Sequence, residues 1–201
     1  MKISVIVPTY QRPPDLARCL TFLKQQTRPV DELWVIVRDT DEKTWQFLEA
    51  FERGSLPLHT TTVTGSGVIA AMNIGLEAAT GDIVVFTDDD AAPHPDWLEK
   101  IEAYYADDQV GGVGGHDWVY NGSKLEDGSQ AVVGKLQWFG RLIGNHHIGS
   151  GGGREVDVLK GVNMSFRRSA IALNLLGIYL TRNFQHIFVR SILVYPRNLT
   201  M

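Results

Sequence analysis

The chain has 201 residues, of which 44% are hydrophobic and 21% are charged, and this balance is typical of a globular domain with an apolar core. Its net charge of -4 gives no bulk attraction to nucleic acid, so we do not expect nucleic acid as a partner. The single cysteine, Cys19, excludes an internal disulfide and favours a reducing, cytoplasmic location. No apolar run approaches the ~18–20 residues that a membrane-spanning helix needs.

Strand and helix patterns alternate along the first half of the chain. A β-branched run predicts a strand at 3–7, and apolar residues at helical spacing predict a helix over 13–27. A strand at 33–37, a helix over 42–54 that Gly54 ends, and a strand at 58–64 follow. The next helix, 67–81, is expected to turn one face to the core: Ile69, Met72, Leu76 and Ala79. A strand at 82–87 and a helix over 94–106 complete the series.

Repeated β-α units predict an α/β fold with a doubly wound, mostly parallel sheet. Ligands of such sheets bind beyond the carboxyl ends of the strands. Four loops are expected to meet there: 8–13, 38–42, 64–68 and 87–93. After residue 106, glycine-rich segments predict further short strands and a long loop around 140–155, a length typical of lids and binding loops.

Three consecutive carboxylates, Asp88, Asp89 and Asp90, follow the strand at 82–87. Neighbouring carboxylates repel one another, so the cluster predicts either a solvated turn before the next helix or a bound divalent cation. Alternation along an extended segment places Asp88 and Asp90 on the same side. This Asp-x-Asp pair suits Mg²⁺, which takes one or two carboxylates together with substrate phosphates.

Three segments together resemble family 2 glycosyltransferases, which have the GT-A fold of nucleotide-diphospho-sugar transferases. They are SVIVPTYQRPPDLARCL, GSGVIAAMNIGLEAATGDIVVFTDDDAAPHPDWLEK and VLKGVNMSFRRSAI, and they cover residues 1–171 in the right order. The resemblance implies a nucleotide-sugar donor and Mg²⁺ or Mn²⁺. It further implies transfer of the sugar, with inversion, to a hydroxyl group of a saccharide, lipid or other acceptor.

The resemblance also assigns residues to the site. It places the donor on the loops at the carboxyl ends of the strands: Pro8, Thr9, Tyr10, Arg12, Asp39, Asn73, Asp88, Asp89, Gly161 and Asn163. It assigns Asp88 and Asp90 as the metal ligands. Asp39 stands where an acidic residue reads the base, but the local sequence departs from Asp-Asp-Gly-Ser and leaves Asp41 as a rival. Met72 replaces an arginine of the family pattern, so one diphosphate contact is missing from it.

The general base is not identified. In the family it lies in an acidic motif beyond Asn163, yet the 44 residues after Asp157 contain six Lys or Arg and no Asp or Glu. Weak candidates are Asp117 and Asp157, and Glu155 could substitute in principle. We therefore expect the chain to bind a donor but to transfer sugar poorly, and the alternative function is a catalytically impaired, nucleotide-sugar-binding remnant of such an enzyme.

The last 30 residues of the chain differ in character from the residues before them. Residues 1–171 are interpreted as the GT-A domain with an incomplete C-terminal part, and 172–201 as a basic, apolar tail that truncation or a frame shift added. One alternative is a divergent natural C-terminus. Another is peripheral association with the inner face of a membrane, through a helix that carries Leu173, Leu176, Leu180, Phe184 and Ile187 on one face.

A few other side chains are candidates. His146 and His147 are weighed as metal ligands against a solvated loop pair, and His116 and Asp117 as sugar or acceptor contacts. The aromatic residues Trp118, Trp138 and Phe139 suit stacking on a sugar, against the alternative of packing in the core or a lid.

Overall fold

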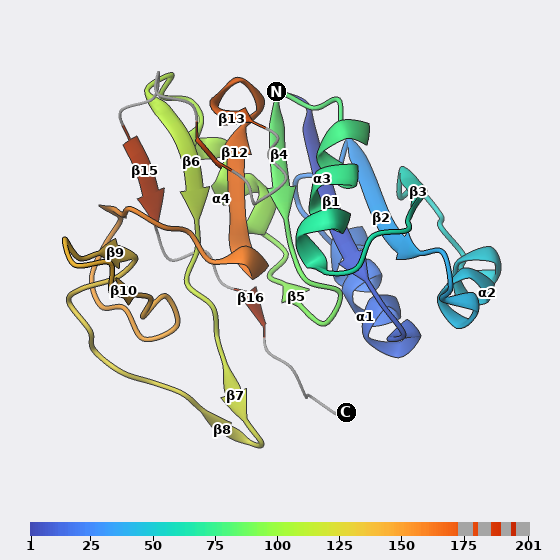
Figure 1. Ribbon diagram of the computed structural model, residues 1–201, viewed down its shortest axis with the longest axis horizontal. Helices are drawn as coiled ribbons and strands as arrows, with labels where there is room; N and C mark the ends of the chain where they lie inside the picture. The colour runs from blue at the N-terminus through green and yellow to red at the C-terminus, as the bar shows by residue number, and fades with distance from the viewer. Residues whose placement is uncertain (173–178, 181–185, 190–193, 196–201) are drawn as a thin grey trace.

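The computed structural model describes residues 1–172, 179–180, 186–189 and 194–195. Within them, one large sheet has the order β11-β15-β6-β12-β4-β1-β2-β3 (Figure 1). Its strands are β1 (Ile3–Thr9), β2 (Glu32–Arg38), β3 (Leu58–Val63), β4 (Ile83–Phe86), β6 (Val110–Gly114), β11 (Arg154–Glu155), β12 (Met164–Arg167) and β15 (His186–Val189). The pairs β1–β2, β1–β4, β2–β3 and β6–β15 are parallel, whereas β12 is antiparallel to both β4 and β6. The mostly parallel sheet predicted from the β-α repeats is confirmed.

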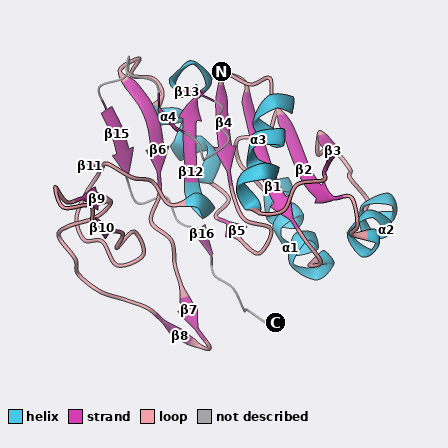
Figure 2. Cartoon of the chain, in the orientation of Figure 1, coloured by secondary structure: helices cyan, strands magenta, loops and turns pink. Residues whose placement is uncertain are grey.

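Helices cover both faces of this sheet (Figure 2). They are α1 (Pro13–Lys24), α2 (Glu42–Ala50), α3 (Val68–Ala78) and α4 (Trp97–Tyr104). One core cluster joins Val5 and Val7 to buried residues of α1, α2 and α4, while a second joins Ile6 to Met72 and Leu76 of α3. Because successive strand residues point to opposite faces, the β-branched runs of β1 and β2 supply both cores.

The four predicted helices are each longer than the observed ones, and one residue assigned to the core is exposed. Ile69 was expected in the core but is 39% exposed, because it lies in the first turn of α3, beyond the edge of the sheet. The helix expected over 42–54 ends at Ala50, since Phe51 already has extended backbone angles. Gly54 instead takes a positive φ of 58° in the turn that follows.

Short paired segments follow the sheet's central strands. They are β5 (Ala92–Pro93) with β16 (Val194–Tyr195), β7 (Tyr120–Asn121) with β8 (Lys124–Leu125), β9 (Lys135–Leu136) with β10 (Leu142–Ile143), and β13 (Ile171–Ala172) with β14 (Tyr179–Leu180). Two single 3₁₀ turns, η1 (Gly161–Asn163) and η2 (Arg168–Ala170), flank β12. The glycine-rich half thus forms hairpins and loops around the sheet.

The helical face proposed for the tail is not what the described residues form. Leu180 lies in β14 and Ile187 in β15, whose backbone pairs with β6 on one side and β11 on the other. Leu173, Leu176 and Phe184 lie outside the described residues. No helix in the described part of the chain combines the length and the apolar character needed to cross a membrane.

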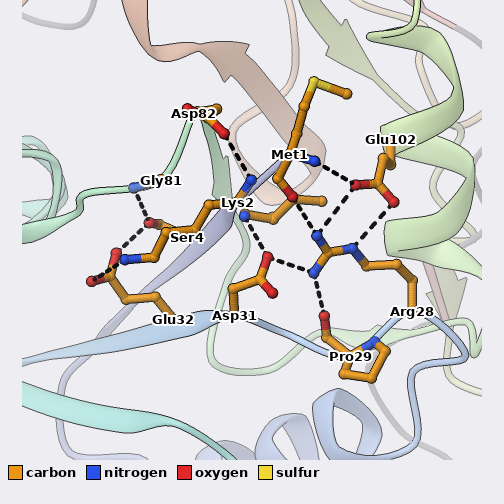
Figure 3. Close-up of polar contacts among 11 residues, drawn as sticks. Met1, Lys2, Ser4, Arg28, Pro29, Asp31, Glu32, Gly81, Asp82 and Glu102 are labelled. Carbon is orange, nitrogen blue, oxygen red and sulfur yellow. Dashed lines mark hydrogen bonds and ion pairs between the residues drawn. The ribbon is translucent and has the colours of Figure 1, made fainter.

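A polar network holds the amino-terminal edge of the sheet, where Lys2 and Ser4 enter β1 (Figure 3). Glu32 of β2 accepts hydrogen bonds from the Ser4 hydroxyl and, at 2.8 Å, from the Thr80 amide. The Gly81 amide donates to Ser4 Oγ at 2.8 Å. These bonds hold the start of β4 against β1 and β2 and fix the register of the three strands. The register in turn fixes where their carboxyl ends lie.

Candidate functional site

Two adjoining cavities open at the carboxyl edge of the parallel strands. The larger has a volume of about 710 Å³ and is lined by residues of five segments: Pro8, Val68, Ile69, Met72, Phe86, Thr87, Asp88, Asp90, Ala91, Asp117, Trp118, Val119, Tyr120, Leu159, Lys160, Gly161, Val162 and Met164. The smaller, about 410 Å³, is lined by Pro8, Thr9, Tyr10, Arg12, Arg38, Val63, Gly65, Ser66, Gly67, Val68, Ala71, Asp88 and Asp89. The cavities share Pro8, Val68 and Asp88. The expected loops 8–13, 64–68 and 87–93 therefore meet, whereas loop 38–42 contributes only Arg38.

The acidic triplet is folded into the wall of these cavities. Asp89 is fully buried and Asp90 is 6% exposed, so the triplet is not a solvated turn. Thr9 Oγ1 donates to Asp89 Oδ2 at 2.7 Å. The guanidinium of Arg12 lies 2.9 Å from Asp89 Oδ1 and 2.8 Å from Asp90 Oδ2. Loop 8–13 thus supplies the cation that balances two of the three charges.

Burial sets the proton affinity of the central carboxylate. It raises the pKa of Asp89 to about 6, although the Thr9 hydrogen bond and the Arg12 charge act in the opposite direction. The neighbouring carboxylates Asp90 and Asp88 raise this pKa further. Since a carboxylate in such a setting resists ionisation, additional positive charge at the triplet would be favourable.

The carboxylates of the triplet are ligands of the kind that a divalent cation prefers. Asp88 and Asp90 both line the larger cavity, but the backbone turns between them, with Ala91 N donating to Asp88 O at 3.2 Å, so the extended segment expected there is not what the structure has. Among the described residues, no group of three or more His, Cys, Asp or Glu side chains could hold a metal ion by itself. Two carboxylates that face one cavity nonetheless fit Mg²⁺ or Mn²⁺ ions, which complete their coordination with water and substrate phosphates. The residues present suit a cation that arrives together with a phosphorylated ligand.

The far wall of the larger cavity carries a third carboxylate. Asp117, just beyond β6, is only 3% exposed, and its Oδ2 lies 2.8 Å from Lys160 Nζ. Asn163 Nδ2 donates to Asp117 Oδ1 at 3.2 Å, and Asn163 Oδ1 accepts from Trp97 Nε1 at 2.9 Å. This network joins the end of β6 to η1 and α4. Sequence reasoning missed Lys160, because no local pattern links it to Asp117.

Several predicted residues lie elsewhere. Asp39 is exposed and accepts from Thr40 N at 3.0 Å, and neither Asp39 nor Asn73 is among the residues that line the two cavities. Asp41 is 2% exposed and caps α2 by accepting from Thr44 N at 3.3 Å. Asp157 lies on the surface, 3.0 Å from Lys135 Nζ, and this pairing and the Leu136 amide hold its pKa below the usual value.

Of the histidine and aromatic candidates, one lines the larger cavity and the others are not among its lining residues. Trp118 lines the larger cavity, whereas Trp138 and Phe139 are exposed and lie outside both sets of lining residues. His146 is buried with its Nε2 2.9 Å from the Val158 carbonyl oxygen, and His147 lies 3.6 Å from Glu126. Burial lowers the pKa of both His116 and His146. The described structure does not bring His146 or His147 to the acidic triplet.

Curated relatives match about half of the chain. Glycosyltransferase AglE of Haloferax volcanii is 32% identical over 120 residues, which is 57% of this chain and 38% of that protein. The uncharacterized glycosyltransferase YwdF of Bacillus subtilis is 33% identical over 102 residues, 50% of this chain and 37% of that protein. The chain therefore spans less than half the length of these relatives.

Solved structures share the fold. TarS of S. aureus superposes with a TM-score of 0.67 at 21% identity, covering 98% of this chain and 37% of that one. The mannosyltransferase PcManGT from Pyrobaculum calidifontis, in complex with GDP-Man and Mn²⁺, gives a TM-score of 0.57 at 23% identity over 83% of this chain and 44% of that one. The GT-A fold expected from the sequence is confirmed.

The family model described as glycosyl transferase family 2 matches residues 4–172, a range that includes every wall of the two cavities. The chain thus belongs to glycosyltransferase family 2.

Proposed function

We propose that this chain binds a nucleotide-diphosphate sugar together with Mg²⁺ or Mn²⁺ and transfers the sugar, with inversion, to an acceptor hydroxyl group. The observation that carries the proposal is the acidic triplet between two adjoining cavities, with Asp117 on the far wall of the larger one. Structures of the same fold support it, since one contains UDP-GlcNAc and another GDP-Man with Mn²⁺. The acceptor is a saccharide, a lipid or another molecule with a free hydroxyl group.

The smaller cavity suits the nucleotide. Pro8, Thr9 and Tyr10 line it, and the ring of Tyr10 is 51% exposed, so a base can stack on it. Arg12 and Arg38 add positive charge on the same wall, which favours an anionic ligand. Asp89 is already bound by Thr9 and Arg12, so it holds the loop, while Asp88 lines both cavities.

Asp88 and Asp90 would hold the cation where the two cavities meet. When bound, the cation supplies positive charge that stabilises the diphosphate as it leaves. The larger cavity then receives the sugar and the acceptor. Gly161 lines it, and no atom lies within 4 Å of the position that a Cβ would occupy there, so this wall is open to a bulky ring.

Asp117 is the carboxylate that geometry favours as general base. Of the three sequence candidates, it alone is among the residues that line the larger cavity in the described structure; Glu155 and Asp157 are not. The acceptor oxygen would bond to the anomeric carbon while its proton moves to the Asp117 carboxylate. The bond from that carbon to the diphosphate oxygen breaks, and the electron pair leaves with the diphosphate. Attack opposite the leaving group inverts the configuration.

Lys160 and Asn163 act on Asp117 rather than on the substrate. Their contacts of 2.8 Å and 3.2 Å fix the two carboxylate oxygens, which would orient Asp117 toward the acceptor. A base held in this way contributes about 10²–10⁴-fold to a transfer rate. Asp117, held by Lys160 and Asn163, would therefore act as the general base for the acceptor. It would replace the base of the acidic motif that the family has beyond Asn163 and this chain lacks.

Calorimetry with UDP and GDP, with and without Mn²⁺, tests the donor half of the proposal on the wild-type chain and on Asp90→Ala. We expect Mn²⁺ to strengthen binding to the wild type and to have little effect on the variant. If binding depends on Mn²⁺ equally in the two proteins, Asp88 and Asp90 do not bind the cation.

Turnover of nucleotide sugars, with simple sugars or water as acceptor, tests the catalytic half. Asp117→Asn should lower the rate by roughly 10²–10⁴-fold while leaving donor affinity unchanged, and the surface variant Asp157→Asn is the matched control. Donor binding by a wild-type chain that does not turn over any donor would favour the second candidate, a nucleotide-sugar-binding remnant. The observation behind that candidate is the lack of any carboxylate after Asp157.

A further inference from the structure

The hairpin formed by β9 and β10 carries an apolar tip that points into solvent. Four large side chains make up this apolar tip, and each is more than half exposed: Leu136 at 56%, Trp138 at 96%, Phe139 at 57% and Leu142 at 52%. No other large hydrophobic side chain in the described part of the chain is as exposed as Trp138. Surface positions rarely gather apolar side chains in this way unless they contact a partner.

The turn itself does not require aromatic residues. Gly140 N donates to Gln137 O and Gln137 N donates to Arg141 O, both at 2.8 Å, so residues 138–140 form the loop of a tight hairpin. Gly140 takes a φ of 86°, as the third position of such a loop demands. Trp138 and Phe139 occupy the two central positions, which usually carry polar or small residues. Their rings meet edge to face, with centroids 5.5 Å apart.

The base of the hairpin is fastened to the body of the protein. Gly134 N donates to Gly144 O at 2.8 Å, and Asp157 N donates to Gly134 O at 2.7 Å. A Cβ at Gly134 would lie only 2.6 Å from the Val158 carbonyl oxygen, so the approach is close. Leu136 N also donates to Asp157 Oδ2 at 3.0 Å. The tip is therefore presented on a fixed support and does not fold back on the core.

The hairpin itself, residues 135–143, carries two basic residues and no acidic one, although Asp157 contacts its base. Residues 128–154 contain three basic residues, Lys135, Arg141 and Arg154, and no Asp or Glu, although the net charge of the chain is -4. Lys135 pairs with Asp157, whereas Arg141 has no ion pair among the described residues. Arg141 adjoins the turn that carries Trp138 and Phe139. Exposed aromatic rings beside a basic side chain match the interface of a membrane with anionic headgroups.

We propose that the apolar tip docks on the surface of a lipid bilayer that contains anionic phospholipid. Trp138 and Phe139 enter the headgroup region, Leu136 and Leu142 follow at its boundary, and Arg141 contacts lipid phosphate. In Figure 1 the hairpin lies on the side of β6 and β15, at the opposite end of the sheet from α2. The proposal is independent of sugar transfer, because none of the four side chains lines the two cavities.

Co-sedimentation of the full 201-residue chain with vesicles tests the proposal. We expect binding to vesicles of phosphatidylcholine with phosphatidylglycerol, and at least tenfold weaker binding to phosphatidylcholine alone. The double variant Trp138→Ala/Phe139→Ala should lose at least tenfold in affinity for the mixed vesicles. Arg141→Gln should weaken binding to the mixed vesicles and reduce its salt dependence, whereas Lys43→Gln, on an exposed face of α2, should change neither.

Fluorescence with brominated phospholipid reports insertion directly. Quenching should be strong in the wild type and in Trp34→Phe, and lost in Trp138→Phe. Because the altered side chains of the tip and Arg141 are exposed, the melting temperatures of these variants should match that of the wild type, and Trp138→Gln replaces any tip variant that melts earlier. Vesicle binding that survives the tip variants would overturn the proposal. So would a wild-type dimer that Trp138→Ala dissociates in the absence of vesicle binding, since a second copy would then cover the tip.

Discussion

Arg12 and Asp90 form an ion pair across 78 residues of sequence, with Arg12 Nη1 2.8 Å from Asp90 Oδ2. The other terminal nitrogen, Nη2, lies 2.9 Å from Asp89 Oδ1, so one guanidinium spans two carboxylates of the triplet. The fork geometry of arginine suits this double contact. Under the proposed function, Arg12 does in the free protein part of what the divalent cation would do in the complex, and the two would compete for Asp90.

Replacing Arg12 with alanine should make the free protein less stable but more responsive to metal. The buried Asp89 loses a charged hydrogen bond, which costs about 1–3 kcal/mol of unfolding free energy. In this variant Mn²⁺ does not have to displace the Arg12 guanidinium from Asp90. The rise in melting temperature on adding Mn²⁺ should therefore exceed that of the wild type. Thermal melts with and without Mn²⁺ measure both effects. Arg12→Lys, which keeps the charge without the fork, should lie between the two, and a smaller metal response in Arg12→Ala than in the wild type would contradict the competition.

Glu32 gives the fold an acid-sensitive contribution. Burial alone would raise the pKa of Glu32, but hydrogen bonds from Ser4 and Thr80 and the charge of Lys2 lower it to about 2. Figure 3 shows Ser4 and Lys2 beside Glu32. Because the folded pKa lies below the unfolded value of 4.5, this stabilisation is complete above pH 4.5 and is lost as the pH falls toward about 2. The difference between 4.5 and about 2 corresponds to a contribution of roughly 3 kcal/mol to the free energy of unfolding at neutral pH.

Urea unfolding of the wild type and Glu32→Gln as a function of pH measures this contribution. Glu32→Gln should be less stable than the wild type at pH 7, and the difference should shrink steadily below pH 4.5. Glu49→Gln, an exposed carboxylate of α2, serves as the control and should show no such convergence. A stability gap for Glu32→Gln that stays constant down to pH 2 would mean that the carboxylate charge is not what stabilises the network.

Gly75 allows α3 to lie close against the sheet. A Cβ at this position would overlap Ile6 Cγ2 and come within 3.3 Å of Ile36 Cδ1. Alanine improves helix propensity by about 1 kcal/mol, but overpacking costs about 1–3 kcal/mol, so Gly75→Ala should be destabilising on balance. Chemical denaturation should show the effect, while Gly152→Ala, where no atom lies within 4 Å, should be neutral. In an Ile6→Ala background, which is itself destabilised, Gly75→Ala should cost less than in the wild type, because the new methyl group occupies space that the shorter side chain leaves.

The sheet, its helices and the acidic triplet could be predicted because each leaves a local pattern. β-branched runs mark β1 and β2, helical spacing marks α1 and α3, and Asp88 to Asp90 follow an apolar strand directly. Contacts between distant segments leave no such pattern. Asp117 and Lys160 meet only because β6 and η1 flank the same cavity, and their partnership could not be inferred from spacing. Ile69 shows the same limit, since helical periodicity cannot tell where a helix passes the edge of a sheet.

The two acidic residues after β2 differ in their surroundings: Asp41 is buried, whereas Asp39 is exposed and lines neither cavity. Asp41 Oδ2 accepts from Gln11 N at 2.6 Å and from Thr44 Oγ1 at 2.6 Å. Gln11 has a positive φ of 56°, which costs energy for a residue with a side chain, so Asp41 holds a strained turn of loop 8–13 as well as the start of α2. Asp39 is exposed and lies 3.2 Å from Arg38 Nε, and Arg38 lines the smaller cavity.

Asp41→Ala should therefore lower the unfolding free energy by about 1–3 kcal/mol, because it removes a helix cap and leaves the Gln11 amide unpaired. Asp39→Ala should leave the melting temperature unchanged but weaken UDP binding by about 1–3 kcal/mol, the range for a lost hydrogen bond to a charged group. Differential scanning calorimetry and UDP titration of both variants separate the two roles. Asn at position 41 can still cap the helix, so Asp41→Asn should recover most of the stability and confirm that capping is the cause. If Asp39→Ala binds UDP as the wild type does while Asp41→Asn binds it weakly at full stability, the base contact belongs to Asp41, two residues further along.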